Sequence, residues 1–227
     1  MITLIRKTLG KLLRSYLSSQ HRVIISYRTM ERMLIFKQIE DIRKSGMMIL
    51  DIPEAFQMVC GVMQTRKLKG NIAEVGTYKG GSAKLICETK ANNTNFYIFD
   101  TFEGLPDQIN IIDSIQFKNG DFEATLEAVK KYLKKYNNVH IHKGLFPATG
   151  EVIKDKKFSF VHLDVDLYKS TKDSIEFFYP RMLKGGIILS HDYITSPGVK
   201  MAIDEFFKDK IEPIIIMNGN QCLMVKI

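Results

Sequence analysis

Apolar residues from position 71 onward fall into short continuous runs, separated by longer stretches with a helical period. Short apolar runs are typical of buried strands, and the longer periodic stretches are typical of amphipathic helices. The pattern predicts strands over 71–75, 95–99, 139–142, 158–163 and 187–189, and helices over 81–90, 122–136, 170–181 and 198–208. This alternation predicts an α/β fold with a doubly wound, mostly parallel sheet.

The end of the chain breaks this alternation. Residues 213–217 and 221–227 are apolar runs joined by Asn218-Gly219, a pair typical of tight hairpin turns. We therefore expect a C-terminal hairpin that adds an antiparallel strand to the sheet. Earlier in the chain, residues 100–120 read as a loop, and we expect Asp121 to cap the helix that follows it.

The first 69 residues read as helices, with breaks near Ser45-Gly46 and Pro53. Asp51, Pro53 and Glu54 have the order expected at a helix start, where an Asp caps and a proline occupies the first turn. We therefore divide the chain into a helical N-terminal extension, residues 1–69, and a sheet-containing domain, residues 70–227.

The net charge of +8 lies mostly in residues 1–44, which contain ten Lys and Arg residues and three acidic ones. Within this arm, residues 5–17 place apolar side chains on one helical face and Lys or Arg on the opposite face. No run is long or apolar enough for a signal peptide or a spanning helix. The helix could pack on its own domain or on a second subunit in a dimer, or residues 1–20 could touch an anionic membrane.

Two further observations bound the partners and the compartment. The basic arm has few aromatic residues for stacking on bases, so we expect no nucleic-acid partner. Three cysteines, Cys60, Cys87 and Cys222, are scattered without close spacing. This usage favours a reducing, cytoplasmic location and argues against a disulfide framework or a cysteine zinc site.

A glycine-rich turn with the spacing E-x-G-x-x-x-G-G-S follows the first predicted strand. It matches neither a P-loop nor the G-x-G-x-x-G dinucleotide fingerprint. Glu74 would repel a pyrophosphate but suits a cationic ligand, which favours S-adenosylmethionine over NAD. Glycines permit a sharp turn and close approach of a ligand, and a serine can cap the next helix. The expected cofactor-binding residues of this turn are Glu74, Gly76, Thr77, Tyr78, Gly80, Gly81 and Ser82. A glycine loop needed only for packing is the alternative.

Asp100 ends the second predicted strand, where an acid can accept hydrogen bonds from both ribose hydroxyls of an adenosine. This arrangement serves NAD and S-adenosylmethionine alike, so it does not separate them. Thr101 and Phe102 come next and join the expected cofactor-binding residues, in a loop that we expect to close over the cofactor. A simple loop aspartate is the alternative reading of Asp100.

Carboxylates and an imidazole follow the next two predicted strands. Asp164 and Asp166 are spaced i, i+2, so in an extended segment they would point the same way. His191 and Asp192 follow the neighbouring strand and would lie beside them. Two carboxylates and an imidazole that converge in this way can hold a divalent ion. Ion pairs with Lys or Arg are the alternative.

Five segments, read together, resemble the macrocin O-methyltransferase family of class I S-adenosylmethionine-dependent methyltransferases. They are AEVGTYKGGSA, FDTFEGLPD, HLDVDLYKST, YPRMLKGGIILSHDY and PGVKMAIDEF, which span about residues 71–207 in the family's order. The resemblance implies that residues 70–227 are a methyltransferase domain with a seven-stranded sheet and a reversed last strand. It also implies methyl transfer to a hydroxyl, often on a sugar of a natural product or glycan.

The resemblance further implies a magnesium ion held by Asp164, His191 and Asp192. The family often has two consecutive acids where this chain has His191-Asp192, and imidazole suits Mn²⁺ or other transition metals better than Mg²⁺. A sugar hydroxyl is a poor nucleophile, which metal coordination and a carboxylate base would activate. We expect Asp166 to be that base, with Asp164 as the alternative and also as a contact of the cofactor. Tyr78, Tyr168 and Tyr193 could line an acceptor pocket.

Three other functions compete with this reading. An NAD-dependent oxidoreductase would need a turn that tolerates phosphate. Metal-independent methyl transfer to RNA is suggested only by the basic arm. A non-catalytic partner with the same fold would not need the retained carboxylates. The reading we favour is a metal-assisted O-methyltransferase that acts on a small, sugar-like hydroxylated acceptor.

Overall fold

The computed structural model describes residues 29–106 and 111–227. The amphipathic segment 5–17, with the contacts expected of residues 1–20, lies outside the described residues. The chain divides into two compact units, residues 1–37 and residues 38–227. Helix α2 (Met30–Lys44) crosses this division, and everything described below belongs to the second unit.

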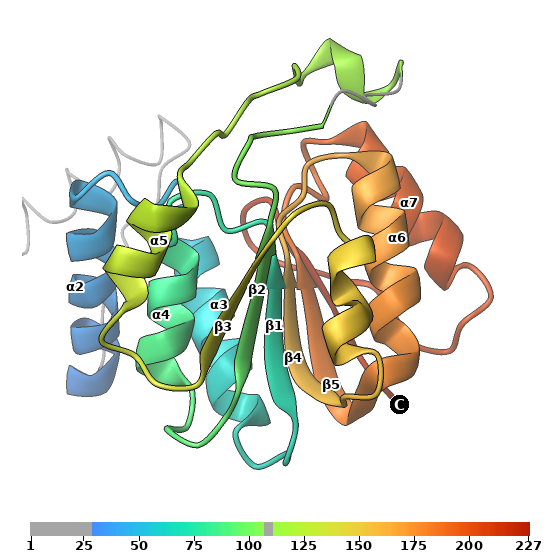
Figure 1. Ribbon diagram of the computed structural model, residues 1–227. Coiled ribbons are helices and arrows are strands. Elements are labelled where there is room, and N and C mark those ends of the chain that lie inside the picture. The colour runs from blue at the N-terminus through green and yellow to red at the C-terminus, as the bar shows by residue number, and fades with distance from the viewer. Residues whose placement is uncertain (1–28, 107–110) are drawn as a thin grey trace, which may run out of the picture. The chain divides into compact units, whose positions relative to one another are not determined.

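Seven strands form one sheet in the described part of the chain (Figure 1). The strands are β1 (Asn71–Val75), β2 (Phe96–Asp100), β3 (Val139–Lys143), β4 (Phe158–Leu163), β5 (Met182–Ser190), β6 (Ile215–Ile216) and β7 (Cys222–Val225). Their order is β3-β2-β1-β4-β5-β7-β6. Strands β1 to β5 are parallel, β7 is antiparallel to β5, and β6 is antiparallel to β7. The structure therefore confirms the doubly wound sheet and the terminal hairpin.

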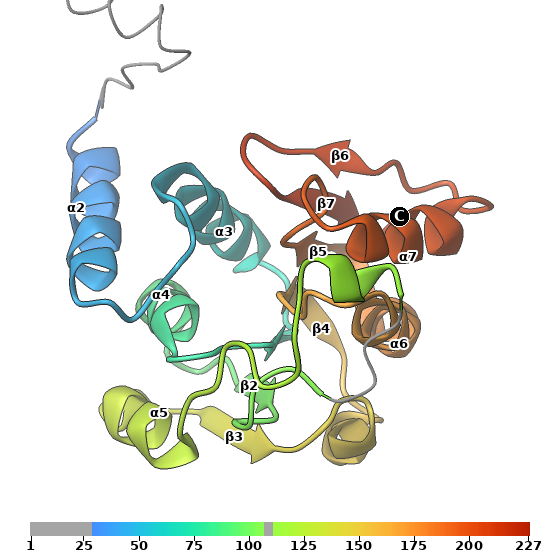
Figure 2. The ribbon, with the colours of Figure 1, turned by 90° about the horizontal axis from the view of Figure 1, so that it is seen from above.

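Helices cover both faces of the sheet (Figure 2). One face carries α3 (Ile52–Thr65), α4 (Gly81–Thr89) and α5 (Leu126–Leu133), and the other carries α6 (Tyr168–Phe178) and α7 (Pro197–Phe207). The described residues also form the short 3₁₀ helices η1 (Asp113–Ile115), η2 (Ala148–Ile153) and η3 (Tyr179–Arg181). No helix of the described residues is long and apolar enough to cross a membrane.

The hydrophobic core lies on both faces of the sheet, between the strands and the helices that cover them. Every residue of β4 is buried, because both of its faces are covered by helices. Val75 and Leu163 belong to the cluster that packs with Ile175 of α6 and Ile203 of α7. On the opposite face α3 contacts β4 and β5. A side-chain carbon at Gly61 of α3 would lie 2.7 Å from the ring of Phe160, so only glycine lets this helix approach so closely.

Helix α3 packs against the sheet. Ala55, Met58, Val59 and Val62 form a buried apolar stripe on this helix. Since α3 contacts α4, β4 and β5, the helices of residues 38–69 belong to the same unit as the sheet. The division into an N-terminal extension, residues 1–69, and a methyltransferase domain, residues 70–227, stays a prediction.

Three element boundaries also differ from the sequence prediction. Helix α5 begins at Leu126 with Thr125 as its cap, because Asp121 instead accepts the backbone N–H of Lys118 in a preceding turn. Helix α6 begins at Tyr168, two positions before the expected start at 170. Strand β5 is longer than expected and includes Gly185, whose N–H donates to the carbonyl of Lys226.

Candidate active site

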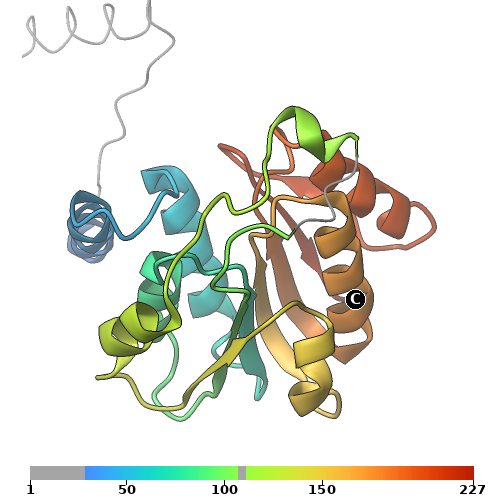
Figure 3. The same cartoon turned by 45° about the horizontal axis from the view of Figure 1, so that its top comes forward.

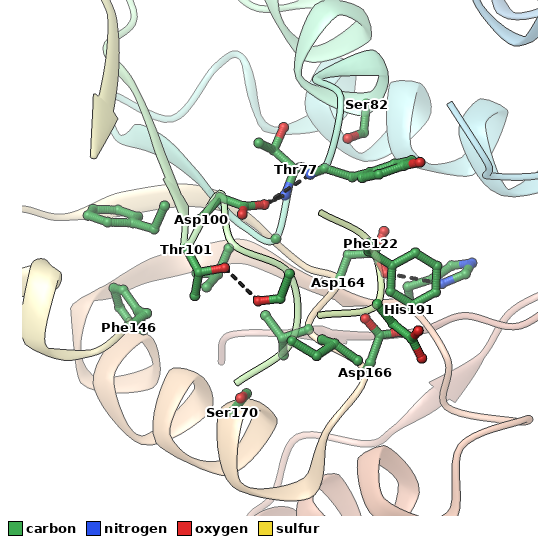
Figure 4. A pocket seen from close by; sticks show the side chains of 18 of the residues that line it. Thr77, Ser82, Asp100, Thr101, Phe122, Phe146, Asp164, Asp166, Ser170 and His191 are labelled. Atoms are coloured by element: carbon green, nitrogen blue, oxygen red, sulfur yellow. Dashed lines mark hydrogen bonds and ion pairs between the residues drawn. The ribbon is translucent and has the colours of Figure 1, made fainter. Parts of the chain in front are cut away.

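A cavity of about 250 Å³ opens at the carboxyl ends of the parallel strands. In open α/β sheets this is where ligands bind. Its wall comes from the turn after β1, the ends of β2, β4 and β5, and residues 47–50 before α3. Thr77 and Asp100 lie on one side of the cavity, and Asp164, Asp166 and His191 lie on the other (Figure 4).

The glycine turn after β1 owes its shape to neighbouring backbone. Gly76 has a φ of +81°, and a side-chain carbon there would lie 1.8 Å from the carbonyl oxygen of Asp164. A side-chain carbon at Gly81 would lie 2.4 Å from the carbonyl oxygen of Met47. Gly80, with a φ of +84°, is the cap residue of α4, so Ser82 lies inside the helix and does not cap it. Of the predicted turn residues, Gly76, Thr77, Tyr78 and Ser82 line the cavity.

Glu74 lies in the interior. Its side chain is fully buried, and its Oε1 lies 2.9 Å from Nδ1 of His162, its register partner on β4. The carboxylate of Glu74 therefore faces His162 in the interior of the sheet. Glu74 is not part of the described cavity wall, and its direct contact with a cationic ligand stays a prediction.

Asp100 joins the end of β2 to the glycine turn. Its Oδ2 accepts the backbone N–H groups of Thr77 and Tyr78 at 2.8 and 2.9 Å, and its Oδ1 accepts that of Phe102 at 2.7 Å. Thr101 also lines the cavity, and its hydroxyl donates to the carbonyl of Gly104. Phe102 is buried and is not part of the cavity wall. Asp100 thus fixes the turn and still faces the cavity.

The predicted carboxylates and imidazole come together at the ends of β4 and β5. Nδ1 of His191 lies 3.2 Å from Oδ1 of Asp164 and 3.1 Å from Oδ2 of Asp192. Ligand atoms of these three residues all lie within 4.8 Å of one another. Asp166 also lines the cavity, although the chain turns at this residue, with a φ of +60°, and is not extended as expected. Asp164 and Asp166 therefore both line the cavity because the chain turns at Asp166, and not because an extended segment points both side chains the same way.

The charges in this cluster are strongly coupled. Burial would lower the pKa of His191, but the carboxylates of Asp164, Asp192 and Glu54 outweigh burial and raise it. Burial acts to raise the pKa of Asp164, but the nearby imidazolium lowers it overall. Burial, together with the charges of Asp164 and Asp192, raises the pKa of Asp166 well above its usual value. The carboxyl groups of Asp164 and Asp166 therefore differ in pKa although they line the same cavity.

Sequence reasoning missed two members of the cluster, Glu54 and Asn220. Oε2 of Glu54 lies 3.3 Å from Nε2 of His191. The side-chain amide of Asn220 donates to Oδ1 of Asp192 at 2.5 Å. Glu54 read as an acid in the first turn of a helix, and Asn220 read as part of a hairpin. No local signal links either residue to β5, because the chain brings them there only in three dimensions.

Residues 101–106 and 111–125, here called the roof segment, form a partial roof above the strand ends (Figure 3). Leu105, Pro106, Phe117 and Phe122 from this segment line the cavity. The carboxylate of Asp113 accepts the backbone N–H of Tyr168 at the start of α6. In addition, the side chain of Gln116 donates to the carbonyl of Thr195 before α7. These contacts hold the described part of the segment over α6 and α7.

The three tyrosines expected around an acceptor separate in the structure. Tyr78 lines the cavity and packs edge-to-face against Phe122, with ring centroids 6.0 Å apart. The hydroxyl of Tyr168 donates to Glu205, and that of Tyr193 donates to Asp204. Neither of these two tyrosines is part of the described cavity wall. They read as structural residues.

The cluster fits a divalent cation. The ring nitrogens of His191 are buried, and although carboxylate oxygens lie within 3.3 Å, none of these described neighbours meets them in hydrogen-bond geometry. A shared cation would satisfy these ring nitrogens and neutralise the converging carboxylates. Carboxylate and imidazole are ligands of divalent first-row metals.

Solved structures show the same fold. The O-methyltransferase NovP is 21% identical, covers 79% of this chain and 82% of its own, and has a TM-score of 0.69. The calicheamicin methyltransferase CalS11 is 16% identical, covers 88% and 94% of the two chains, and has a TM-score of 0.67. At these identities the likeness concerns the fold alone.

Two curated relatives match over part of their length. A demethyldecarbamoylnovobiocin O-methyltransferase from Streptomyces niveus is 24% identical over 60% of this chain and 58% of its own. A tetracenomycin-C rhamnosyl 4'-O-methyltransferase from Streptomyces olivaceus is 27% identical over 55% of this chain and 53% of its own. The matched region thus spans just over half of the length of these relatives.

The family model decides the assignment. The model described as macrocin O-methyltransferase (TylF) matches residues 46–222, which include α3, strands β1 to β6 and every residue of the carboxylate–imidazole cluster. This range begins before α3, in agreement with the packing of that helix on the sheet. The chain belongs to the macrocin O-methyltransferase family.

Proposed function

We propose that this protein is an S-adenosylmethionine-dependent, divalent-metal-assisted O-methyltransferase that methylates a hydroxyl of a sugar or a glycosylated natural product. The observation that carries the proposal is one cavity, in a chain of this family, that joins the glycine turn to the carboxylate–imidazole cluster. The two curated relatives are both O-methyltransferases from Streptomyces, and their names refer to derivatives of novobiocin and of tetracenomycin C.

The turn side of the cavity suits the cofactor. We assign cofactor contacts to Gly76, Thr77, Tyr78, Asp100 and Thr101, which share the cavity wall. The argument from the charge of Glu74 no longer separates S-adenosylmethionine from NAD, since this side chain is fully buried. Membership of the family supports S-adenosylmethionine in its place, and the bound cofactor would supply an electrophilic methyl group on its sulfonium.

The cluster side of the cavity suits the acceptor hydroxyl. Asp164, His191 and Asp192 would hold a divalent ion, Mg²⁺ or Mn²⁺, which lowers the pKa of a bound hydroxyl. Asp166 is our candidate for the general base, with Asp164 as the alternative. Burial and its charged neighbours raise the pKa of Asp166, which brings its proton affinity closer to that needed for a base near neutral pH.

The experiment is transfer of a labelled methyl group from S-adenosylmethionine to a panel of deoxysugar glycosides and phenolic glycosides, with and without EDTA. We expect labelled product that depends on added metal. Asp166→Asn should lower kcat by about 10²–10⁴-fold while S-adenosylhomocysteine still binds. Asp155→Asn, at an exposed position, is the matched control and should leave kcat unchanged. A D166N enzyme with full activity would remove Asp166 from the mechanism.

The cellular location and the partners of the protein stay predictions. We expect a cytoplasmic location, a homodimer, no nucleic-acid partner and contact of residues 1–20 with a membrane surface. Gel filtration of a variant lacking residues 1–20 addresses the dimer, because an arm that reaches across to a second subunit would lower the elution volume of the full chain only.

A further inference from the structure

Glu54 is held in place from two directions. Its Oε2 accepts the backbone N–H of Asp51 at 2.8 Å, which completes the capping box of α3. Its Oε1 accepts the backbone N–H of Asn220 at 2.9 Å. A side-chain carbon at Gly219 would lie 2.8 Å from the same oxygen, so glycine is required for this approach. Glu54 is 7% exposed, and its carboxylate is thus fixed toward His191.

Asn220 orients the other side of the cluster. Its side-chain oxygen accepts the backbone N–H groups of Ile194 and Thr195, at 3.2 and 2.9 Å. These two bonds fix which way the amide points, so its nitrogen donates to Oδ1 of Asp192. The second oxygen of Asp192, Oδ2, is left to face Nδ1 of His191. One turn of the terminal hairpin therefore orients both Glu54 and Asp192.

The imidazole of His191 lies between these fixed groups. Its Nε2 faces a single carboxylate, that of Glu54, at 3.3 Å, and its Nδ1 faces two, those of Asp164 and Asp192, at 3.2 and 3.1 Å. Neither nitrogen meets these carboxylates in hydrogen-bond geometry. Adjacent ligands of an octahedral ion with bonds of about 2.1 Å are separated by about 3.0 Å. The two Nδ1 distances are close to this separation, so Nδ1 is placed to share an ion with two carboxylates, whereas Nε2 faces only Glu54.

We propose that Glu54 is a positioning residue that accepts a proton-bearing Nε2 of His191, so that Nδ1 is a metal ligand and the site prefers a first-row transition ion such as Mn²⁺ over Mg²⁺. A carboxylate behind a histidine ligand fixes its tautomer and raises its basicity. Imidazole favours transition ions, whereas carboxylate and water ligands suit Mg²⁺. This inference rests on the proposed function for the location of the metal, and it adds the metal's identity and the role of Glu54.

The direct test is pulsed electron paramagnetic resonance of Mn²⁺ bound to the metal-free protein. A coordinating imidazole nitrogen gives ¹⁴N modulation of the Mn²⁺ echo, and we expect this signal in the native chain. His191→Asp should still bind Mn²⁺ but should lose the ¹⁴N signal. A native spectrum without directly coordinated ¹⁴N would overturn the proposal.

Competition between the two ions tests the selectivity. We expect the native chain to bind Mn²⁺ at least tenfold more tightly than Mg²⁺, and His191→Asp to shift this ratio toward Mg²⁺ by about tenfold or more. Equal Mn²⁺ to Mg²⁺ ratios in the native chain and in H191D would contradict the assignment. If S-adenosylmethionine binds and methyl transfer proceeds while the ratio is unchanged, the function stands and this inference alone fails.

Glu54→Gln tests the positioning role. We expect about a tenfold loss of Mn²⁺ affinity, in the range found for outer-shell partners of ligating histidines, and a changed ¹⁴N coupling. Glu88→Gln is the matched control, because Glu88 also accepts hydrogen bonds from side chains but lies outside the cavity wall. Thermal melts without metal separate a folding defect from a metal defect. An E54Q protein that folds and keeps both the affinity and the ¹⁴N coupling would exclude Glu54 from this role.

Discussion

The backbone N–H of Asn220 donates a 2.9 Å hydrogen bond to Oε1 of Glu54, across 166 positions of the chain. This bond joins the turn of the reversed C-terminal hairpin to the first turn of α3. Because Glu54 faces His191 and the side chain of Asn220 holds Asp192, both ends of the domain support the same cluster. The hairpin therefore contributes to the site as well as to the edge of the sheet.

Removal of the Asn220 amide tests this support. Asn220→Ala keeps the backbone bond to Glu54 but leaves Oδ1 of Asp192 with the longer bond from the hydroxyl of Thr195, at 3.3 Å. We therefore expect divalent-metal affinity to fall by about tenfold. Asn218→Ala is the control, since Asn218 lies in the same turn and is exposed. Calorimetric titration of Mn²⁺ into the two variants gives the comparison. Equal affinities would mean that the amide does not orient Asp192.

The glycine turn offers a test with a matched pair of glycines. Gly76 and Gly46 both have positive φ values, of +81° and +72°, but only Gly76 has a backbone atom in the way of a side chain. Gly46→Ala should cost about 1 kcal/mol, as expected for strain in a left-handed conformation. Gly76→Ala should cost more than about 3 kcal/mol, because strand β1 must separate from the end of β4. Urea unfolding measures both.

The sequence predicted the frame of this fold well because the frame depends on local periodicity. Strand β4 is a continuous apolar run and reads as a strand without any neighbour, and Asn218-Gly219 encodes the hairpin through its turn preference. The start of α5 was misread because Asp121 has the right side chain for a helix cap but is used by a turn of the roof segment.

The sequence predicted only those site residues whose positions follow from the order of the strands. Asp164, His191 and Asp192 follow adjacent strands, so they meet in any sheet with this order. Glu74 has the residue type of a ligand contact, but its position within β1 directs it into the interior. Glu54 and Asn220 reach the cluster only through the packing of α3 and the hairpin, and no spacing in the sequence records such contacts.

A substitution at Gly198, which is not part of the cavity wall, should displace the roof segment. A side-chain carbon at Gly198 of α7 would lie 1.9 Å from Oδ1 of Asp113, the residue that holds η1 against α6. Gly198→Ala should therefore displace the roof while the helix itself tolerates alanine well. We expect cofactor affinity to fall about fivefold or more with little change in melting temperature. Unchanged S-adenosylhomocysteine affinity would show that the docking of η1 does not matter for cofactor binding.

Acid stability should depend on Glu212. Burial acts to raise the pKa of this carboxyl, but hydrogen bonds from Lys226, Tyr179 and backbone N–H groups lower it to about 2. Because the folded pKa lies below the ordinary value of 4.5, the carboxylate stabilises the fold above about pH 4.5. This contribution is lost as the pH falls from 4.5 toward 2.

Urea unfolding at pH 7 and at pH 3 measures this effect. Glu212→Gln should be less stable than the native chain at pH 7 by about 1–3 kcal/mol and should lose less stability on acidification. Asp209→Asn, at an exposed position, should follow the native profile. If E212Q keeps the full acid dependence, other carboxyl groups are responsible for it.

The central claim is that the cavity at the ends of β1 and β2 binds S-adenosylmethionine. Calorimetric titration of S-adenosylmethionine, and separately of NAD, into the full chain with and without EDTA tests it most directly. We expect micromolar binding of S-adenosylmethionine with one site per chain, no binding of NAD, and no loss of cofactor affinity when EDTA is added. Binding of NAD but not of S-adenosylmethionine would contradict it.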